Sequence, residues 1–115
     1  MKKENNKLKF FFINKTLFDT TQDYEIACKI QQRRLQMLVH SYIYYELNQN
    51  IISDDKFTEW GVELKALQDK YPTIARKVLL NEVFEKFEGF SGYNLPYNHE
   101  WVINKAHKLL SYKNI

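Results

Sequence analysis

The feature of this sequence that most constrains its fold is a run of large apolar side chains at alternating steps of three and four residues. The residues of this run are Phe57, Trp60, Leu64, Leu67 and Tyr71. A helix of about 3.6 residues per turn places such positions on one face. Ser53 offers a capping hydroxyl ahead of two acids, and Pro72 disfavours helical backbone at Tyr71. The pattern therefore predicts an amphipathic helix between Ser53 and Tyr71.

Three further helices are expected around it, because only three glycines and two prolines argue against a turn-rich β fold. Thr20 is a capping residue for a long first helix over residues 21–48. The apolar face of that helix would comprise Ile26, Ile30, Leu35, Met37, Leu38, Tyr42 and Tyr44. Thr73 would cap a third helix that stops near Gly89, and Asn98 would cap a final one.

The chain is expected to form a single domain over residues 1–115, since its length suits one core. Residues 1–18 would form a polar tail and an extended arm over Leu8–Phe18, and residues 20–112 would be helical. The predicted class is all-α, a small domain of about four helices with an extended N-terminal arm. Whether the aromatic arm at residues 10–13 is covered by its own chain or by a neighbour is left open, as is oligomerisation.

Composition excludes several classes of function. The formal charge of +3 is mild, so nucleic-acid binding through Arg33, Arg34 and the C-terminal lysines is disfavoured against a solvated helix face. The single Cys28 rules out an internal disulfide and a cysteine-based zinc site, and fits the reducing cytoplasm. The apolar run at residues 10–13 is too short for a membrane span.

No motif predicts catalysis or a metal site. His99-Glu100 begins a zinc-protease helix motif, but the second histidine position, 103, holds Ile103. Asp54 and Asp55 are explained by their place at a helix start. The sequence therefore predicts a protein that is not an enzyme and has no cofactor or metal.

One stretch carries a family resemblance that spans residues 41–72. Its matching positions are Tyr44-Tyr45, Ile52-Ser53-Asp54, Phe57, Glu63-Leu64, Leu67 and Tyr71-Pro72. In these residues and their spacing the chain resembles the N-terminal Ia domain of NAD-dependent bacterial DNA ligases. With its Leu-Pro-Tyr loop and its Trp-Val-Ile-Asn-Lys-Ala ending, it is similar to ligase-related phage and prophage proteins of Gram-positive bacteria.

The resemblance implies a site for the nicotinamide mononucleotide half of NAD. Tyr44 matches the tyrosine that lies against the nicotinamide, and Asp54 matches an acidic nucleotide contact. Tyr45 stands where many ligases have a histidine, Phe57 replaces a tyrosine, and Thr58 replaces an aspartate. These departures weaken the family's polar recognition, because an apolar ring supplies no hydrogen-bond donor or acceptor.

The family's nucleophilic motif, Lys-x-Asp-Gly, is missing, since no Asp-Gly pair occurs in the sequence. We therefore expect a non-enzymatic phage or prophage accessory protein that acts on a host or defence protein through a protein–protein interface, in the cytoplasm of the bacterial host. The alternative is a binder of nicotinamide mononucleotide, NAD or a related nucleotide at Tyr44, Tyr45, Asp54, Phe57 and Thr58.

Overall fold

The computed structural model describes residues 13–89 and 95–113, and within these ranges the chain forms helices and no strand. The elements are a short 3-10 helix, η1 (Lys15–Leu17), and the α-helices α2 (Thr21–Tyr45), α3 (Asp54–Lys70), α4 (Pro72–Arg76), α5 (Asn81–Phe84) and α6 (Glu100–Lys113). The predicted all-α class is confirmed.

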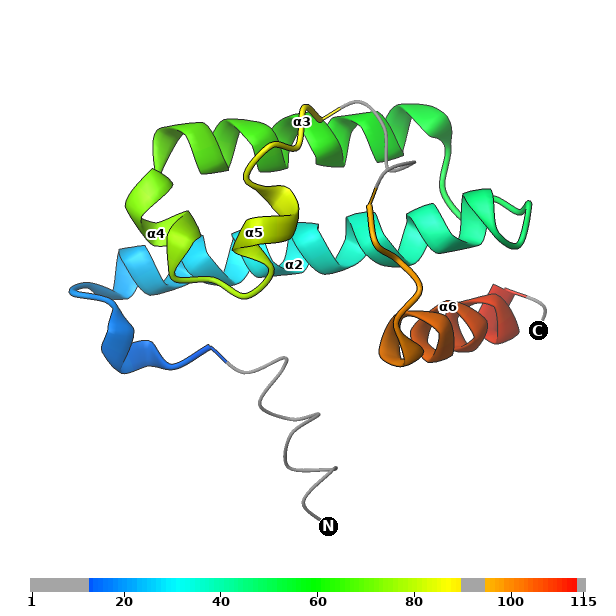
Figure 1. Ribbon diagram of the computed structural model, residues 1–115, viewed down its shortest axis with the longest axis horizontal. Coiled ribbons are helices and arrows are strands. Elements are labelled where there is room, and N and C mark those ends of the chain that lie inside the picture. Colours follow the sequence, from blue (N-terminus) through cyan, green and yellow to red (C-terminus); the bar gives the residue numbers. More distant parts are fainter. Residues whose placement is uncertain (1–12, 90–94, 114–115) are drawn as a thin grey trace, which may run out of the picture.

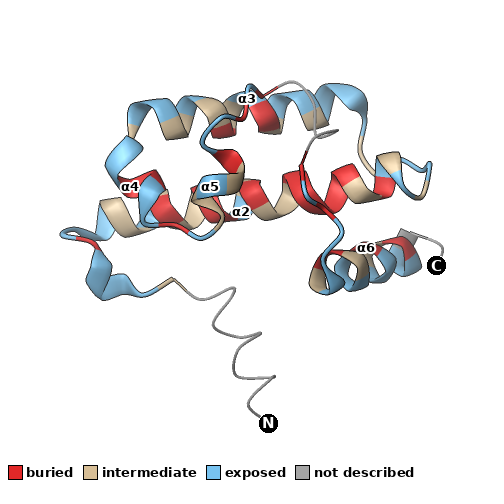
Figure 2. Ribbon diagram, viewed as in Figure 1, coloured by how far each residue is buried: buried red, intermediate tan, exposed pale blue. Residues whose placement is uncertain are grey.

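Helix α2 is the central element of the fold. Helices α3, α4 and α5 lie on one side of it and α6 lies on the other (Figure 1). Buried positions recur along α2 from Ala27 to Ile43, whereas the buried residues of α3 are Gly61 and Leu64 (Figure 2). Thr20 caps α2 as predicted, its side chain accepting a hydrogen bond from the Asp23 N–H at 3.0 Å. The helix ends at Tyr45 rather than at residue 48.

Helix α3 follows the sequence prediction closely. The Ser53 hydroxyl accepts a hydrogen bond from the Lys56 N–H at 3.0 Å, and so satisfies one of the free amides at the helix start. Leu64 is fully buried, and the other predicted apolar residues of this face are partly buried against the core. The spacing of three and four residues therefore predicted both the helix and the side by which it packs on α2.

The third predicted helix, from Thr73 to Gly89, was wrong as a single element. Pro72 opens α4 at its first position, without a cap from Thr73, and that helix ends at Arg76. The chain then turns through Leu80, which adopts a left-handed conformation with φ 73° and ψ 19° before α5 begins. A continuous helix cannot pass through such a residue.

Arg34 of α2 explains why the chain turns at this place. It is fully buried, and its guanidinium donates to the carbonyl oxygens of Ala75, Val78 and Leu79 at 3.3, 3.1 and 2.9 Å. Its remaining N–H groups donate to side-chain oxygens of Gln68 and Asn81. Because the guanidinium has five N–H donors, this set of five acceptors satisfies it completely. The N–H groups of Arg34 thus take the place of the backbone donors that a continuing helix would supply to these carbonyls.

Helix α6 packs on α2 through Val102, Ala106 and Leu110, which are buried and lie one turn apart. The Ile103 N–H donates to the carbonyl oxygen of His99 at 3.0 Å, so His99 rather than the predicted Asn98 directly precedes the helix.

Of the predicted extended arm, residues 8–12 lie outside the described residues, and with them most of the aromatic stretch at 10–13. The described part is extended at Asn14 and Phe18, on either side of η1. Phe18 is buried, and Lys77 donates a hydrogen bond to the Leu17 carbonyl at 3.0 Å. These contacts attach the segment to the α4 end of the domain.

Candidate functional site

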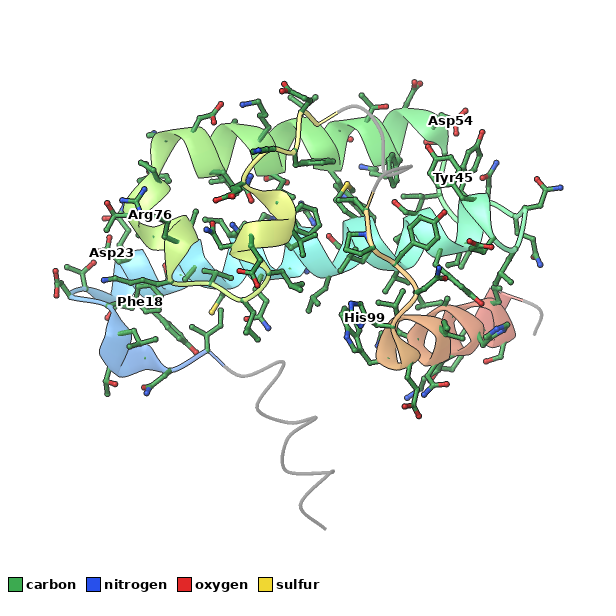
Figure 3. All side chains as sticks on the ribbon, in the orientation of Figure 1. Phe18, Asp23, Tyr45, Asp54, Arg76 and His99 are labelled. Carbon is green, nitrogen blue, oxygen red and sulfur yellow. The ribbon has the colours of Figure 1, made fainter. Side chains whose placement is uncertain are left out.

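A pocket of about 170 Å³ lies at one end of the molecule, where α2 ends and α3 begins. Figure 3 shows Tyr45 and Asp54 at this end. The lining residues are His40, Ile43, Tyr44, Tyr45, Gln49, Asn50, Ile51, Ile52, Ser53, Asp54, Phe57 and Thr58. All five ligand-binding residues predicted from the sequence therefore line one hollow.

The pocket exists because the chain reverses direction within a few residues. Asn48 adopts a left-handed conformation with φ 53°, which asparagine tolerates better than most residues. The Gln49 N–H then donates to the Ile43 carbonyl at 3.1 Å and closes the end of α2. Ser53 starts α3 a few residues later. The last turns of α2 are thus placed beside the first turn of α3.

Aromatic rings form much of the pocket wall. The ring of Tyr44 meets that of Tyr45 edge to face, with centroids 4.9 Å apart and an interplanar angle of 85°. Tyr45 stacks on the buried Tyr97 at 6.1 Å and 10°, and Phe57 is half-buried. Tyr44 was predicted to lie on the apolar face of its helix, but it is 47% exposed. Its ring is therefore available at the rim of the pocket.

The polar groups of the lining are amides, hydroxyls, one carboxylate and one imidazole. Asp54 is exposed in the first turn of α3, where the helix dipole favours a negative charge. Thr58, one turn further along, is also exposed. The Ser53 hydroxyl is already used to cap α3. The described residues of the lining include no lysine or arginine, so Asp54 gives this part of the pocket a negative character.

Sequence reasoning missed His40, which lies one helical turn before Tyr44 on α2 and also lines the pocket. The residue is 8% exposed, and its Nδ1 has no hydrogen-bond partner within residues 13–89 and 95–113. Its ring packs against Trp60 with centroids 5.4 Å apart and an angle of 63°. Burial lowers the pKa of His40 below its ordinary value of 6.5, so the imidazole is neutral at neutral pH. The signal in the sequence was its four-residue spacing from Tyr44.

Lowering the pH is expected to destabilise the fold through His40. In the unfolded chain the pKa of His40 is about 6.5, and in the folded chain burial lowers it. The unfolded state therefore binds more protons, so the free energy of unfolding decreases as the pH falls below 6.5 and levels off below the folded pKa. Urea unfolding of the wild type and of His40→Phe across this range measures the effect. If both proteins lose stability in parallel, His40 is not the responsible group.

The two arginines that a nucleic-acid hypothesis would use are engaged within the fold. Arg34 is buried as described above, and burial lowers its pKa to about 10, so it remains charged at neutral pH. Arg33 forms an ion pair with Glu63, and its guanidinium lies over the Trp60 ring at 5.2 Å from the centroid. Neither arginine is thus displayed on an open surface for phosphate binding.

A second, more polar hollow of about 320 Å³ lies among α3, α4 and α5. Its residues are Lys65, Gln68, Asp69, Pro72, Ala75, Arg76, Asn81, Glu85 and Phe87. Several of its polar groups already have partners, since Gln68 and Asn81 bind Arg34, and Lys65 pairs with Asp69 at 2.8 Å. None of the predicted site residues lies there.

The described residues contain neither a metal-binding cluster nor a membrane-spanning helix. No cluster of three or more histidine, cysteine, aspartate or glutamate side chains could hold a metal ion in residues 13–89 and 95–113. None of the helices in these ranges has both the length and the apolar character needed to cross a bilayer.

Comparison of the chain with protein-family models, with curated proteins and with solved structures found no match.

Proposed function

We propose that this protein is a non-enzymatic binding module that holds the ring of a nicotinamide-type ligand in the pocket between α2 and α3. The observation that carries the proposal is the convergence of Tyr44, Tyr45, Asp54, Phe57 and Thr58 on one pocket. The ligase resemblance selected these residues without reference to their position in space.

The chemistry of the pocket supports a flat aromatic ligand. Tyr44, Tyr45 and Phe57 offer ring faces and edges, and a contact between two aromatic rings contributes about 0.5–1.5 kcal/mol beyond its buried area. A pyridinium ring carries a positive charge, which the faces of the tyrosines and the carboxylate of Asp54 would stabilise. The pocket thus combines an apolar wall with a few polar groups, as small-molecule sites do.

The ligand-binding proposal is tested by calorimetry and thermal shift with nicotinamide mononucleotide, NAD and cyclic ADP-ribose. We expect at least one to release or absorb heat and to raise Tm, because a ligand that binds only the folded state stabilises it. Tyr44→Ala should weaken binding by about 2- to 10-fold, the equivalent of one ring contact. Since Tyr44 is 47% exposed, this change should leave the fold intact.

Tyr112→Ala is the matched control, because Tyr112 is 60% exposed on α6 and lies outside the pocket. The affinity of this variant for the nucleotides should equal that of the wild type. If neither these nucleotides nor nicotinamide itself gives heat or a shift in Tm, the ligand-binding proposal fails.

A second candidate is the protein–protein interface with a host or defence protein, and the exposed ring of Tyr44 supports it. Tyrosine is enriched in the buried centres of protein interfaces. In that case a purified partner would bind the wild type and Tyr112→Ala equally but would lose affinity for Tyr44→Ala, while the nucleotides gave no heat. Equal binding to all three proteins would count against this surface.

A further inference from the structure

His40 is the only buried titratable side chain that lines the pocket, among the residues that the structure describes. It is more than nine-tenths buried, yet its Nδ1 makes no hydrogen bond to any residue that the structure describes. Buried polar groups nearly always have a partner, because an unpaired one loses its hydration without compensation. A half-turn of the imidazole exchanges its nitrogen and carbon positions without moving the ring plane, so the ring can present a nitrogen to the pocket.

The position of this ring is fixed by packing. Trp60 lies against His40 at 5.4 Å, and the Arg33 guanidinium lies over the same indole at 5.2 Å. Glu63 in turn pairs with Arg33 and with Lys29. The imidazole is therefore held in place by Trp60, which is not one of the lining residues, and its Nδ1 is left without a partner among the described residues. A group held in this way is suited to bind a ligand with little loss of conformational entropy.

Burial keeps the His40 imidazole neutral, although the carboxylate of Asp54 in the same pocket would favour its charged form. Arg33 lies beyond Trp60, Asp54 lies at the exposed end of the pocket, and the two tyrosines of α2 also line it. Burial is the dominant effect and lowers the pKa of His40. A neutral imidazole offers one acceptor nitrogen and one N–H donor. It can therefore accept a hydrogen bond from an amide or a ring N–H of a ligand.

The size and charge of the pocket restrict the rest of the ligand. At about 170 Å³ it is smaller than the roughly 300–1,000 Å³ that holds a drug-sized molecule, so it accommodates about one ring. Among the described residues no lysine or arginine lines it, and Asp54 would repel a phosphate. The pocket thus favours an uncharged or cationic ring without phosphate.

We propose that His40 is the specificity-determining residue of this pocket, and that its ligand is a phosphate-free heteroaromatic ring bearing an N–H donor. The inference rests on the proposed function, because it names the class of ring that the same pocket holds. The inference adds a contact, His40, that lies outside the stretch of ligase resemblance. It also states that the pocket recognises the ring alone and not the phosphate of a nucleotide.

Two pairs of ligands test the proposal on the wild-type protein by calorimetry at neutral pH. Nicotinamide has an amide N–H, whereas methyl nicotinate has the same ring with an ester and no donor. We expect nicotinamide to bind about tenfold more tightly, as for one buried hydrogen bond. Nicotinamide riboside should bind at least as tightly as nicotinamide mononucleotide, which differs from it by the phosphate.

His40→Phe removes both nitrogens and keeps a ring of similar size against Trp60. It should bind nicotinamide and methyl nicotinate equally. His99→Phe is the matched control, since His99 is exposed and lies outside the pocket, and it should keep the tenfold preference. If His40→Phe does not fold, the wild-type ligand pairs still test whether the pocket prefers an N–H donor and disfavours a phosphate.

The outcomes separate this inference from the proposed function. Equal affinity of the wild type for nicotinamide and methyl nicotinate, or tighter binding of the mononucleotide than of the riboside, overturns the inference while ring binding stands. A preference that survives in His40→Phe assigns the recognition to another residue and also overturns it. Absence of binding by every ring ligand removes both proposals.

Discussion

Replacing Arg34 with methionine is expected to lower the free energy of unfolding by about 3–5 kcal/mol, because several buried acceptors lose their donors at once and each unsatisfied group costs about 1–3 kcal/mol. The carbonyls concerned belong to Ala75, near the end of α4, and to Val78 and Leu79, in the turn between α4 and α5. For a domain of this size the loss corresponds to a decrease in Tm of roughly 15 °C or more. Thermal and urea unfolding, followed by far-UV circular dichroism, measure it.

Arg76→Met is the control for removing an arginine from this part of the fold. Arg76 is exposed and makes one long hydrogen bond, to Thr73 at 3.4 Å, so the change should alter stability by less than about 0.5 kcal/mol. The free energy of unfolding of Arg34→Lys should lie between those of Arg34→Met and Arg76→Met, since an ammonium has three donors and lacks the planar fork. Near-wild-type stability of Arg34→Met would contradict the anchoring role of Arg34.

Gly61→Ala is expected to destabilise the protein by about 1–3 kcal/mol, as overpacking does, although alanine is the better helix former. A Cβ atom at Gly61 would lie 2.5 Å from the carbonyl oxygen of Gly89, which is a backbone atom and cannot rotate away. Gly89 itself adopts φ 91°, a conformation that favours glycine, so the segment that follows α5 has little freedom to retreat. Urea unfolding measures the change.

Val62→Ala is the control for helix propensity at the neighbouring position of α3. Val62 is 50% exposed, so truncation removes little buried area, and alanine favours the helix. Its stability should equal or slightly exceed that of the wild type. A gain in stability for Gly61→Ala would show that the chain at Gly89 moves away from α3 at little cost.

Local patterns predicted the parts of the fold that local interactions determine. The cap at Ser53 and the apolar spacing up to Tyr71 placed α3 almost to the residue. The segment after Pro72 could not be predicted in this way, because the turn at Leu80 depends on Arg34, more than forty positions earlier in the sequence. Periodicity treats an arginine as a surface residue, and only the folded chain shows the carbonyls that it binds.

The candidate site, too, could be predicted from the sequence only in part. The ligase resemblance selected five residues near the α2–α3 turn, and the structure places them around one pocket. It gave no sign of His40, because a buried imidazole is recognised by its lack of a partner and by its contact with Trp60. Both are properties of the packed chain. Likewise, the apolar pattern placed Tyr44 inward, whereas the end of α2 leaves it at the rim.

The arrangement of α6 across α2 from the other helices has a consequence for how the domain opens. Segments that share fewer buried contacts can exchange their amide hydrogens through partial unfolding, at a free energy below that of global unfolding. Helix α6 presents one stripe, Val102, Ala106 and Leu110, to α2, whereas α2 is covered from two sides (Figure 1). The C-terminal helix is thus the part that can detach first, while the core of α2 exchanges only when the whole domain unfolds.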